Sequence, residues 1–179
     1  IDISAFVNAS TSEITYDYNH EKLDNVTSKY VKNNTMKTAP TYPEIDEFAV
    51  ENWYFDEQFT SVLEYEKLYT HVFTSESSLY AKWSRVSELF VEGSEADFSY
   101  EDFENGVSIT AYNGNERYLE LPQTLGGKTV IQIGASAFSN NARLTRIVLP
   151  DTITSIGEKA FENCLLLNEI NIPASVVQI

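Results

Sequence analysis

A repeat of 23 residues occupies the C-terminal part of this chain and limits its possible folds more than any other feature. Residues 130–152 and 153–175 align without a gap, and Ile179 then falls at the position of Ile133 and Ile156. Other pairs that match in type are Gly134/Gly157, Ala137/Ala160, Phe138/Phe161, Leu144/Leu167, Ile147/Ile170 and Pro150/Pro173. Such a period is typical of solenoids, in which one coil cannot bury its own apolar face and neighbouring coils stack.

Each repeat contains a short predicted strand, at residues 146–149 and 169–172. Alternation predicts that Ile147 and Leu149 point into the core with Ile170 and Ile172 stacked beside them. Pro150 and Pro173 end the strands because proline donates no ladder hydrogen bond. We expect Gly134 and Gly157 to supply a turn that a side chain would obstruct, and Phe138 to pack on Phe161 across the opposite wall.

Both copies resemble the leucine-rich repeats of the Bacteroides surface protein A (BspA) type, with the pattern I-G-x-x-A-F-x-x-C-x-x-L-x-x-I-x-I-P. The first copy has Asn141 at the cysteine position. Upstream, Leu119-Glu120-Leu121-Pro122 resembles a first strand, with five extra residues before Ile133. We interpret this segment as an atypical first coil that acts as a cap. The resemblance implies a solenoid used for adhesion or partner binding on bacterial surfaces.

Only two full repeats are present, and arrays usually need about three. We therefore expect a truncated array, the alternative being a very short array held by the N-terminal domain. The chain opens with Ile1, which also favours a processed or excised piece.

The N-terminal half has a different pattern. Period-2 stretches at residues 13–18 and 26–31 predict strands, and Pro40 and Pro43 interrupt the chain after them. Together with Trp53-Tyr54-Phe55-Asp56 and Leu79-Tyr80-Ala81-Lys82-Trp83, they resemble the Listeria–Bacteroides repeat, the B-repeat of internalin-type surface proteins. Asn52 stands where that pattern has glycine. The resemblance implies a small β-grasp-like domain in which Trp53 and Trp83 are core anchors or partly exposed packing residues.

These patterns predict a mainly β (α+β) protein with two domains. An N-terminal extension (residues 1–10) precedes the Listeria–Bacteroides repeat domain (11–84). A linker (85–96) then leads to the repeats and their atypical first coil (97–179). Within the linker, residues 86–91 are either one turn of helix or a strand, and residues 92–95 are a flexible joint.

Charge and cysteine content exclude several classes of function. The chain has 12 basic and 27 acidic residues and a net charge of −15, which argues against binding nucleic acid or anionic membranes. No apolar run approaches the ~18 residues that span a bilayer, so this fragment has no predicted membrane span. The single cysteine, Cys164, excludes an internal disulfide and a cysteine-based zinc cluster.

No motif indicates catalysis, a cofactor or a metal. Gly126-Gly127-Lys128-Thr129 resembles the end of a phosphate loop, but Pro122 occupies the position of its first glycine, so we expect a turn. Asp17, Asn19 and Glu21 have the first spacings of a calcium loop without its glycine, which indicates a solvated turn. We expect an inert thiol at Cys164, surface or hydrogen-bonded imidazoles at His20 and His71, and glycosylation at Asn8, Asn25 and Asn33 only in a eukaryotic secretory route.

The sequence therefore predicts a non-enzymatic recognition or adhesion module, extracellular or on a bacterial cell surface. Its predicted partner is a protein or a glycan, bound by the outward strand residues Arg146, Val148, Glu169 and Asn171. The same register sets Arg146 beside Glu169. The alternative function is a passive spacer in a larger surface protein. An enzyme would require a deep pocket with converging carboxylates.

Overall fold

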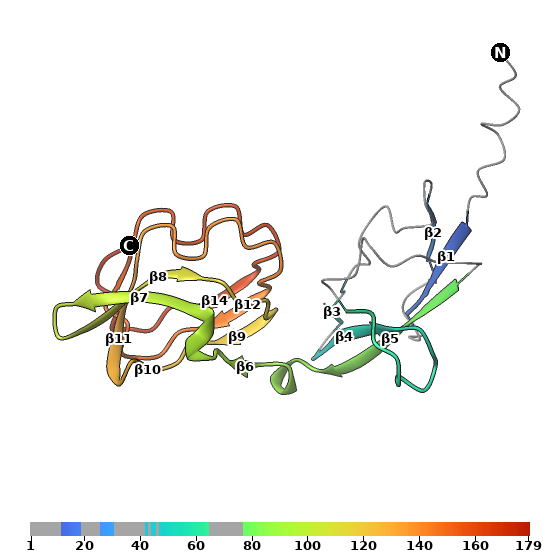
Figure 1. Cartoon of the computed structure of the whole chain (residues 1–179), viewed down its shortest axis with the longest axis horizontal. Helices are drawn as coiled ribbons and strands as arrows, with labels where there is room; N and C mark the ends of the chain where they lie inside the picture. Colours follow the sequence, from blue (N-terminus) through green and yellow to red (C-terminus); the bar gives the residue numbers. More distant parts are fainter. Residues whose placement is uncertain (1–11, 19–25, 31–41, 43, 46, 65–76) are drawn as a thin grey trace, which may run out of the picture. The chain divides into compact units, whose positions relative to one another are not determined.

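The computed structural model describes residues 12–18, 26–30, 42, 44–45, 47–64 and 77–179, and the structural statements below concern these residues. The chain divides into two compact units, Ile1–Leu89 and Phe90–Ile179 (Figure 1). The regular elements of the described residues are strands joined by short 3-10 turns. The prediction of a mainly β protein is confirmed.

The first unit contains a five-stranded sheet with the order β2-β1-β5-β4-β3. Its central strands β1 and β5 are parallel, and the other neighbours are antiparallel. The strands predicted near residues 13–18 and 26–31 are present as β1 and β2. The β-grasp-like architecture implied by the Listeria–Bacteroides resemblance stays a prediction. The strand bounds are Ser12–Asp17 (β1), Val26–Tyr30 (β2), Glu44–Ile45 (β3), Phe48–Tyr54 (β4) and Ser77–Arg85 (β5).

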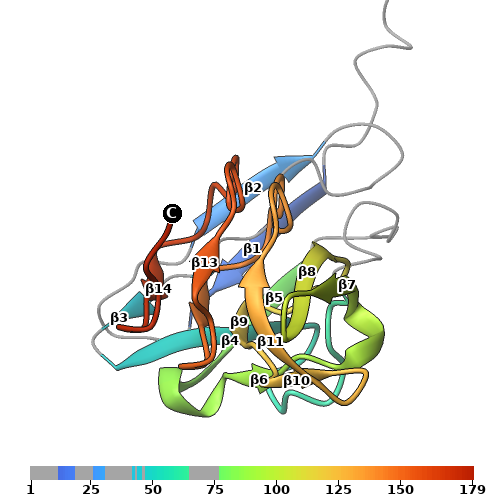
Figure 2. The ribbon, with the colours of Figure 1, turned by 90° about the vertical axis from the view of Figure 1, so that its left-hand side faces the viewer.

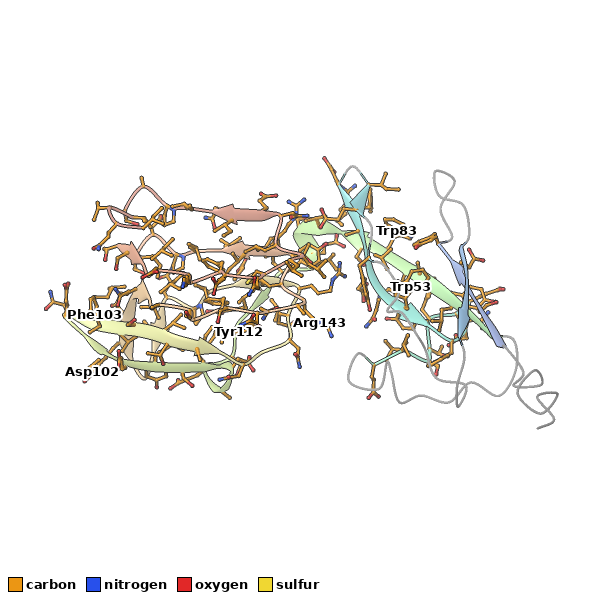
Figure 3. All side chains as sticks on the ribbon, turned by 90° about the horizontal axis from the view of Figure 1, so that it is seen from above. Trp53, Trp83, Asp102, Phe103, Tyr112 and Arg143 are labelled. Carbon is orange, nitrogen blue, oxygen red and sulfur yellow. The ribbon has the colours of Figure 1, made fainter. Side chains whose placement is uncertain are left out.

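Two tryptophans anchor this sheet (Figure 3). Trp53 is fully buried and packs edge-on against Tyr18, with 5.1 Å between ring centroids. Trp83 is half-buried, and its indole Nε1 donates a hydrogen bond of 2.6 Å to the carbonyl of Tyr18. Trp53 is thus a core anchor and Trp83 a partly exposed packing residue, which are the two roles that the sequence predicted. The Tyr18 carbonyl supplies the acceptor that an indole N–H away from water needs.

Asp56 organises the loop that follows β4. Its carboxylate accepts hydrogen bonds from the backbone N–H groups of Gln58, Thr60 and Ser61, at 2.7–3.2 Å. The bonds from Thr60 and Ser61 outweigh the small cost of desolvation and lower the pKa of this carboxyl. Phe59 adopts a positive φ of 57° at the centre of the loop.

The second unit is a solenoid of stacked coils held by two parallel ladders (Figures 1 and 2). One ladder is a four-stranded sheet with the order β14-β12-β9-β6. The other joins β8, β11 and β13, and sets Ile109, Ile133 and Ile156 side by side. The predicted Ile133–Ile156 pairing is confirmed. The bounds are Val91–Glu92 (β6), Gly106–Tyr112 (β8), Tyr118–Glu120 (β9), Lys128–Ile133 (β11), Arg146–Val148 (β12), Ser155–Ile156 (β13) and Glu169–Asn171 (β14).

Stacked aromatic rings run along the third wall of the coils, which is formed by the turns at residues 135–140 and 158–163, outside the two ladders. The predicted contact of Phe138 with Phe161 is present, with stacked rings 5.1 Å apart. The stack continues beyond the two clear repeats, because Tyr112 lies 5.2 Å from Phe138 and Phe98 lies 5.2 Å from Tyr112. Tyr112 therefore takes the phenylalanine position of the preceding coil.

The tight bends of this wall use residues other than glycine. Ser136 and Lys159 have φ angles of 57° and 58°, and Asn140 and Asn163 both have 60°. The Asn163 side chain donates a hydrogen bond of 3.0 Å to the Asn140 side chain. Asparagine tolerates this left-handed conformation better than most residues, and the ladder between coils offsets its cost.

The repeat glycines begin the predicted turns, since the Ala137 and Ala160 N–H groups donate to the Gly134 and Gly157 carbonyls. Neither Gly134 nor Gly157 has a positive φ. A Cβ at Gly134 would lie 2.7 Å from the carbonyl oxygen of Ile109, and one at Gly157 would lie 2.5 Å from the backbone nitrogen of Ala135. The neighbouring coil thus excludes a side chain, and close backbone approach selects glycine.

The first coils differ from the regular repeats. The strand β7 (Phe98–Phe103) pairs antiparallel with β8. The five extra residues before Ile133 form a hairpin between β10 (Thr124–Leu125) and β11, with Gly126 and Gly127 at φ 57° and 73°. The segment predicted as a linker, residues 85–96, includes the turn η3 (Val86–Glu88), β6 and the start of the turn η4 (Glu95–Asp97). Of the two alternatives predicted for residues 86–91, the helical turn is present as η3, and only Val91 lies in a strand.

Candidate partner-binding face

The four-stranded sheet of the second unit sorts its residues into an inward and an outward set. Leu119 and Ile147 occupy the same row on neighbouring strands and are buried in the core. Residues before and after each of them point to the other face, because successive side chains of a strand alternate. The parallel register aligns these outward residues in two rows, one across β9, β12 and β14 and the other across all four strands.

The first outward row consists of Tyr118, Arg146 and Glu169, and so combines an aromatic ring with an ion pair. The Phe90 ring meets the Tyr118 ring edge-on at 5.7 Å, and the Arg117 guanidinium lies 5.2 Å from the centre of the Tyr118 ring. These neighbours leave Tyr118 only 3% exposed. The Arg146 guanidinium donates to the Glu169 carboxylate, so the predicted pairing is confirmed.

The second outward row consists of Glu92, Glu120, Val148 and Asn171. Glu92 and Glu120 are exposed on adjacent strands, and Val148 is half-buried. The Asn171 Oδ1 accepts a hydrogen bond of 2.6 Å from the Leu149 N–H, and its Nδ2 donates one of 3.4 Å to the Leu149 carbonyl. Asn171 therefore stabilises the coil junction although its side chain is exposed.

The structure brings the four predicted residues together on adjacent strands, with Arg146 beside Glu169 and Val148 beside Asn171. Their binding of a partner stays a prediction. Sequence reasoning did not include the three outward residues of the earlier strands, which are Glu92, Tyr118 and Glu120, nor Phe90, which precedes β6 and packs on Tyr118. The two on β9 were detectable, because aligning Pro122 with Pro150 places Tyr118 at Arg146 and Glu120 at Val148. We name the exposed part of this surface, Glu92, Glu120, Arg146, Val148, Glu169 and Asn171, the sheet face.

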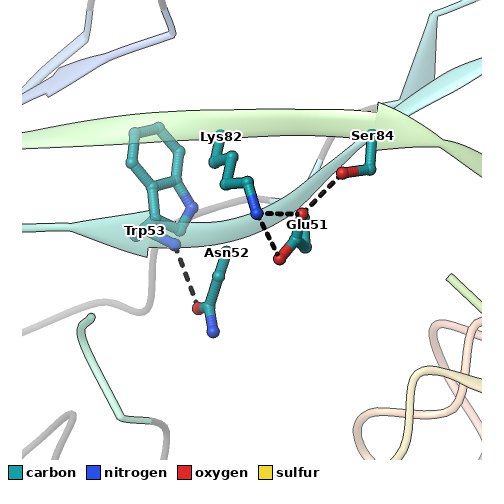
Figure 4. Close-up of polar contacts among 5 residues, drawn as sticks. All are labelled: Glu51, Asn52, Trp53, Lys82 and Ser84. Atoms are coloured by element: carbon teal, nitrogen blue, oxygen red, sulfur yellow. Dashed lines mark hydrogen bonds and ion pairs between the residues drawn. The ribbon is translucent and has the colours of Figure 1, made fainter. Parts of the chain in front are cut away.

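A second polar cluster lies on the sheet of the first unit (Figure 4). Glu51 accepts hydrogen bonds from the Lys82 ammonium at 2.9 Å and from the Ser84 hydroxyl at 2.5 Å. Burial opposes ionisation of Glu51, but these two bonds together outweigh it and lower its pKa. Asn52 accepts a hydrogen bond of 3.0 Å from the Trp53 N–H. The arrangement is an ion pair whose carboxylate is already engaged by its neighbours.

The other predicted sites have structural explanations. Gly126 and Gly127 form the hairpin turn of β10 and β11, which agrees with the predicted turn. The Cys164 thiol is half-buried and lies 3.0 Å from the Phe138 carbonyl, and burial raises its pKa, which disfavours the reactive thiolate. Asp17 lies in β1.

Several predicted positions lie outside the described residues: the extension at residues 1–10 with Asn8, and also Asn19, His20, Glu21, Asn25, Asn33, Pro40, Pro43 and His71. In the part of the chain that the structure describes, no three His, Cys, Asp or Glu side chains are grouped to hold a metal. The same part contains no helix with the length and apolarity required to cross a bilayer.

Comparison with known proteins identifies the repeats. The family model described as "BspA type Leucine rich repeat region (6 copies)" matches residues 112–179. No curated protein matches the chain. The matched residues do not include the first unit, so its resemblance to the Listeria–Bacteroides repeat stays a prediction.

Solved leucine-rich repeat proteins also resemble the chain. The T. pallidum leucine rich repeat protein is 30% identical with a TM-score of 0.46, covering 48% of this chain and 41% of that protein. A Bacteroides ovatus leucine-rich repeat protein is 33% identical with a TM-score of 0.40, covering 45% and 23%. A leucine rich cell surface protein of Faecalibacterium prausnitzii is 32% identical with a TM-score of 0.40, covering 46% and 24%.

This chain spans less than half of the length of each of these three proteins. The period, the coil geometry and the family model agree on the same segment. Residues 112–179 thus match the BspA type of leucine-rich repeat.

Proposed function

We propose that this chain is a non-enzymatic recognition module that binds a protein partner through the sheet face, in an extracellular or cell-surface setting. The observation that carries the proposal is the outward surface of four parallel strands, on which Glu92, Glu120, Val148 and Asn171 form one continuous row. Rigid strand faces of solenoids are suited to large partners because they present side chains at fixed spacing.

Charge indicates the kind of protein that would bind. Glu92, Glu120 and Glu169 are exposed on the sheet face, and the positive charge of Arg146 is engaged by Glu169. The whole chain carries a net charge of −15. A basic surface on the partner would relieve the repulsion between neighbouring carboxylates and would be attracted at long range.

A cell-surface location is supported by the printed description of one similar protein, the cell surface protein of F. prausnitzii. Adhesion would be one use of such a module. The spacer alternative predicts that the chain binds nothing, so a binding experiment separates the two functions.

The test measures binding of the full chain to a panel of extracellular matrix proteins and to a glycan array. We expect binding to a basic protein that weakens at least tenfold when Glu92 and Glu120 are both changed to Arg, and that weakens as salt is raised. The matched control changes Glu158 and Glu162 to Arg, because both are exposed on another wall of the coils.

The control variant should bind like the parent chain. Equal losses in both variants would show attraction to net charge and would contradict recognition by the sheet face. Binding only to glycans would replace the protein partner with a glycan, and absence of any binding would favour the spacer.

A further inference from the structure

The strand β7 lies at one end of the sheet order β10-β11-β8-β7, and its neighbour in that sheet is β8. Beyond this pairing, the backbone of residues 99–103 makes no hydrogen bond within the described part of the second unit. Figure 3 shows β7 as the outermost strand of this unit in that view, with Asp102 and Phe103 near its end. A strand of six residues with one unpaired side is a place where another strand can add.

Alternation along β7 decides which backbone groups point away from β8. The two-residue loop Glu104-Asn105 joins Phe103 to Gly106, and these two residues lie opposite each other. The closing pair of such a hairpin exchanges its backbone hydrogen bonds, and every second pair after it does the same. The N–H and carbonyl groups of Asp102 and Tyr100 therefore point outward. They form a row of donors and acceptors that a further strand can use.

Acidic side chains flank this row. Glu101 and Glu104 are exposed, and neither has a cation or a hydrogen-bond donor beside its carboxylate among the described residues. Asp102 is exposed as well, but its carboxylate accepts from the Lys128 ammonium at 2.6 Å. The half-buried Phe103 lies on the same face of the strand as Glu101, two residues further along. We name the outward backbone groups of Tyr100 and Asp102, together with Glu101, Phe103 and Glu104, the β7 edge.

We propose that the β7 edge binds an extended, basic segment of a partner protein, which adds to the sheet as a further strand. Main-chain hydrogen bonds to the outward groups of Tyr100 and Asp102 supply the affinity, as strand addition does in general. A lysine or arginine opposite Glu101 lies on the same face as this carboxylate, and its aliphatic stem reaches the Phe103 ring. Charge complementarity thus selects a basic strand over an acidic or neutral one.

The same charges disfavour a second copy of the chain at this site. In a two-fold antiparallel pairing, Tyr100 of one copy lies opposite Asp102 of the other, and the two Glu101 carboxylates then face each other. Like charges directly opposite destabilise a sheet, and each copy carries a net charge of −15. The β7 edge shares no residue with the sheet face, so this inference is independent of the proposed function.

The test uses the full chain and a capped peptide of about seven residues that alternates lysine with valine, a pattern suited to one added strand. We expect the peptide to slow hydrogen exchange at the Tyr100 and Asp102 amides at least tenfold, because these outward groups gain acceptors. The Glu101 and Phe103 amides, which already pair with β8, should change little. The same peptide with every backbone nitrogen methylated keeps its charge but has no N–H donor, and it should bind at least tenfold more weakly.

Charge-reversed variants place the peptide on the strand. Glu101→Lys combined with Glu104→Lys should weaken binding at least tenfold, whereas Glu92→Lys combined with Glu120→Lys makes the same change of charge on the sheet face and should bind like the parent chain. Equal losses in the two variants, equal binding of the methylated peptide, or unchanged exchange at the Tyr100 and Asp102 amides would overturn the proposal. A dimeric parent chain in which these two amides already exchange slowly would also overturn it, by showing that a second copy occupies the edge.

Discussion

Tyr112 carries a buried phenol within the aromatic stack of the second unit. Burial raises its pKa to about 12, and its hydroxyl accepts a hydrogen bond of 3.2 Å from the Glu116 N–H. Burial therefore favours the protonated phenol in the folded chain. Between its usual pKa of 10.0 and about 12, the unfolded chain loses this proton while the folded chain keeps it, so the free energy of unfolding falls as pH rises.

Tyr112→Phe should remove this part of the pH dependence. At pH 8 the variant should lose only ~0.5–1.5 kcal/mol, the usual contribution of one hydrogen bond. Urea unfolding of both proteins at pH 8 and pH 11 checks the prediction. An equally steep loss of stability in the variant would show that other groups cause the alkaline effect.

Arg146 and Glu169 form an exposed ion pair on neighbouring strands. Because the Glu169 side chain is 59% exposed, solvent screens the attraction. A double-mutant cycle with Arg146→Ala and Glu169→Ala should give a coupling of ~0.2–1 kcal/mol at low salt and less at high salt. A coupling that is zero at low salt would contradict the contact.

At the scale of elements, the aromatic stack should contribute unequally along the solenoid. Phe138 is buried between Tyr112 and Phe161, whereas Phe161 is half-buried in the second repeat. Phe138→Ala should cost ~3–5 kcal/mol of unfolding free energy, the range for buried aromatic truncations. Phe161→Ala should cost clearly less, because its truncation leaves a space open to water.

Chemical unfolding of the two variants measures this difference. Leu165→Ala is a suitable control, since Leu165 is 86% exposed and its loss should be nearly neutral. Equal costs for the two phenylalanines would mean that Phe161 is as well covered in solution as Phe138.

The coil geometry was predictable wherever the sequence repeats. The ladder of Ile133 and Ile156, the Phe138–Phe161 stack and the Arg146–Glu169 pair all follow from one period, because equivalent residues of stacked coils must meet. The place of Tyr112 in the aromatic stack did not follow from the period. Tyr112 comes three positions after Ile109, whereas Phe138 comes five positions after Ile133. A fixed period of 23 residues does not align equivalent positions in a coil of different length.

The candidate face was predictable to the same extent. The repeat period gives the register of β12 and β14, and this register places the four predicted residues next to one another in pairs. β6 has two residues and no repeated motif, and its pairing with β9 depends on contacts between distant parts of the chain. The hydrogen bonds that engage Asn171 with Leu149 are likewise a property of tertiary structure.

At the scale of the whole molecule, the two units have separate hydrophobic cores. One core gathers residues between Tyr18 and Trp83, and the other gathers residues between Phe98 and Val176. No described residue belongs to both cores. We therefore propose that the second unit folds without the first, with the boundary between Leu89 and Phe90.

Two fragments of the chain test this boundary. A fragment of residues 90–179 should melt within a few degrees of the second unit in the full chain. A fragment of residues 97–179 begins where the sequence alone placed the repeat domain. It lacks β6, the Phe90 ring on Tyr118 and the Ser94 cap of η4, so its first ladder strand becomes β9. Its melting temperature should be lower by roughly 8 °C or more.

Differential scanning calorimetry of both fragments and the full chain gives the comparison, and the full chain should show two transitions. If the two fragments melt together, β6 adds no stability and the domain begins at residue 97. If the longer fragment is unfolded while the full chain is folded, the second unit depends on the first. We expect the longer fragment to fold and the shorter one to be less stable. This outcome agrees with a solenoid whose first stabilising strand is the two-residue β6. At this end of the sheet, β6 is the outermost strand and the backbone partner of β9.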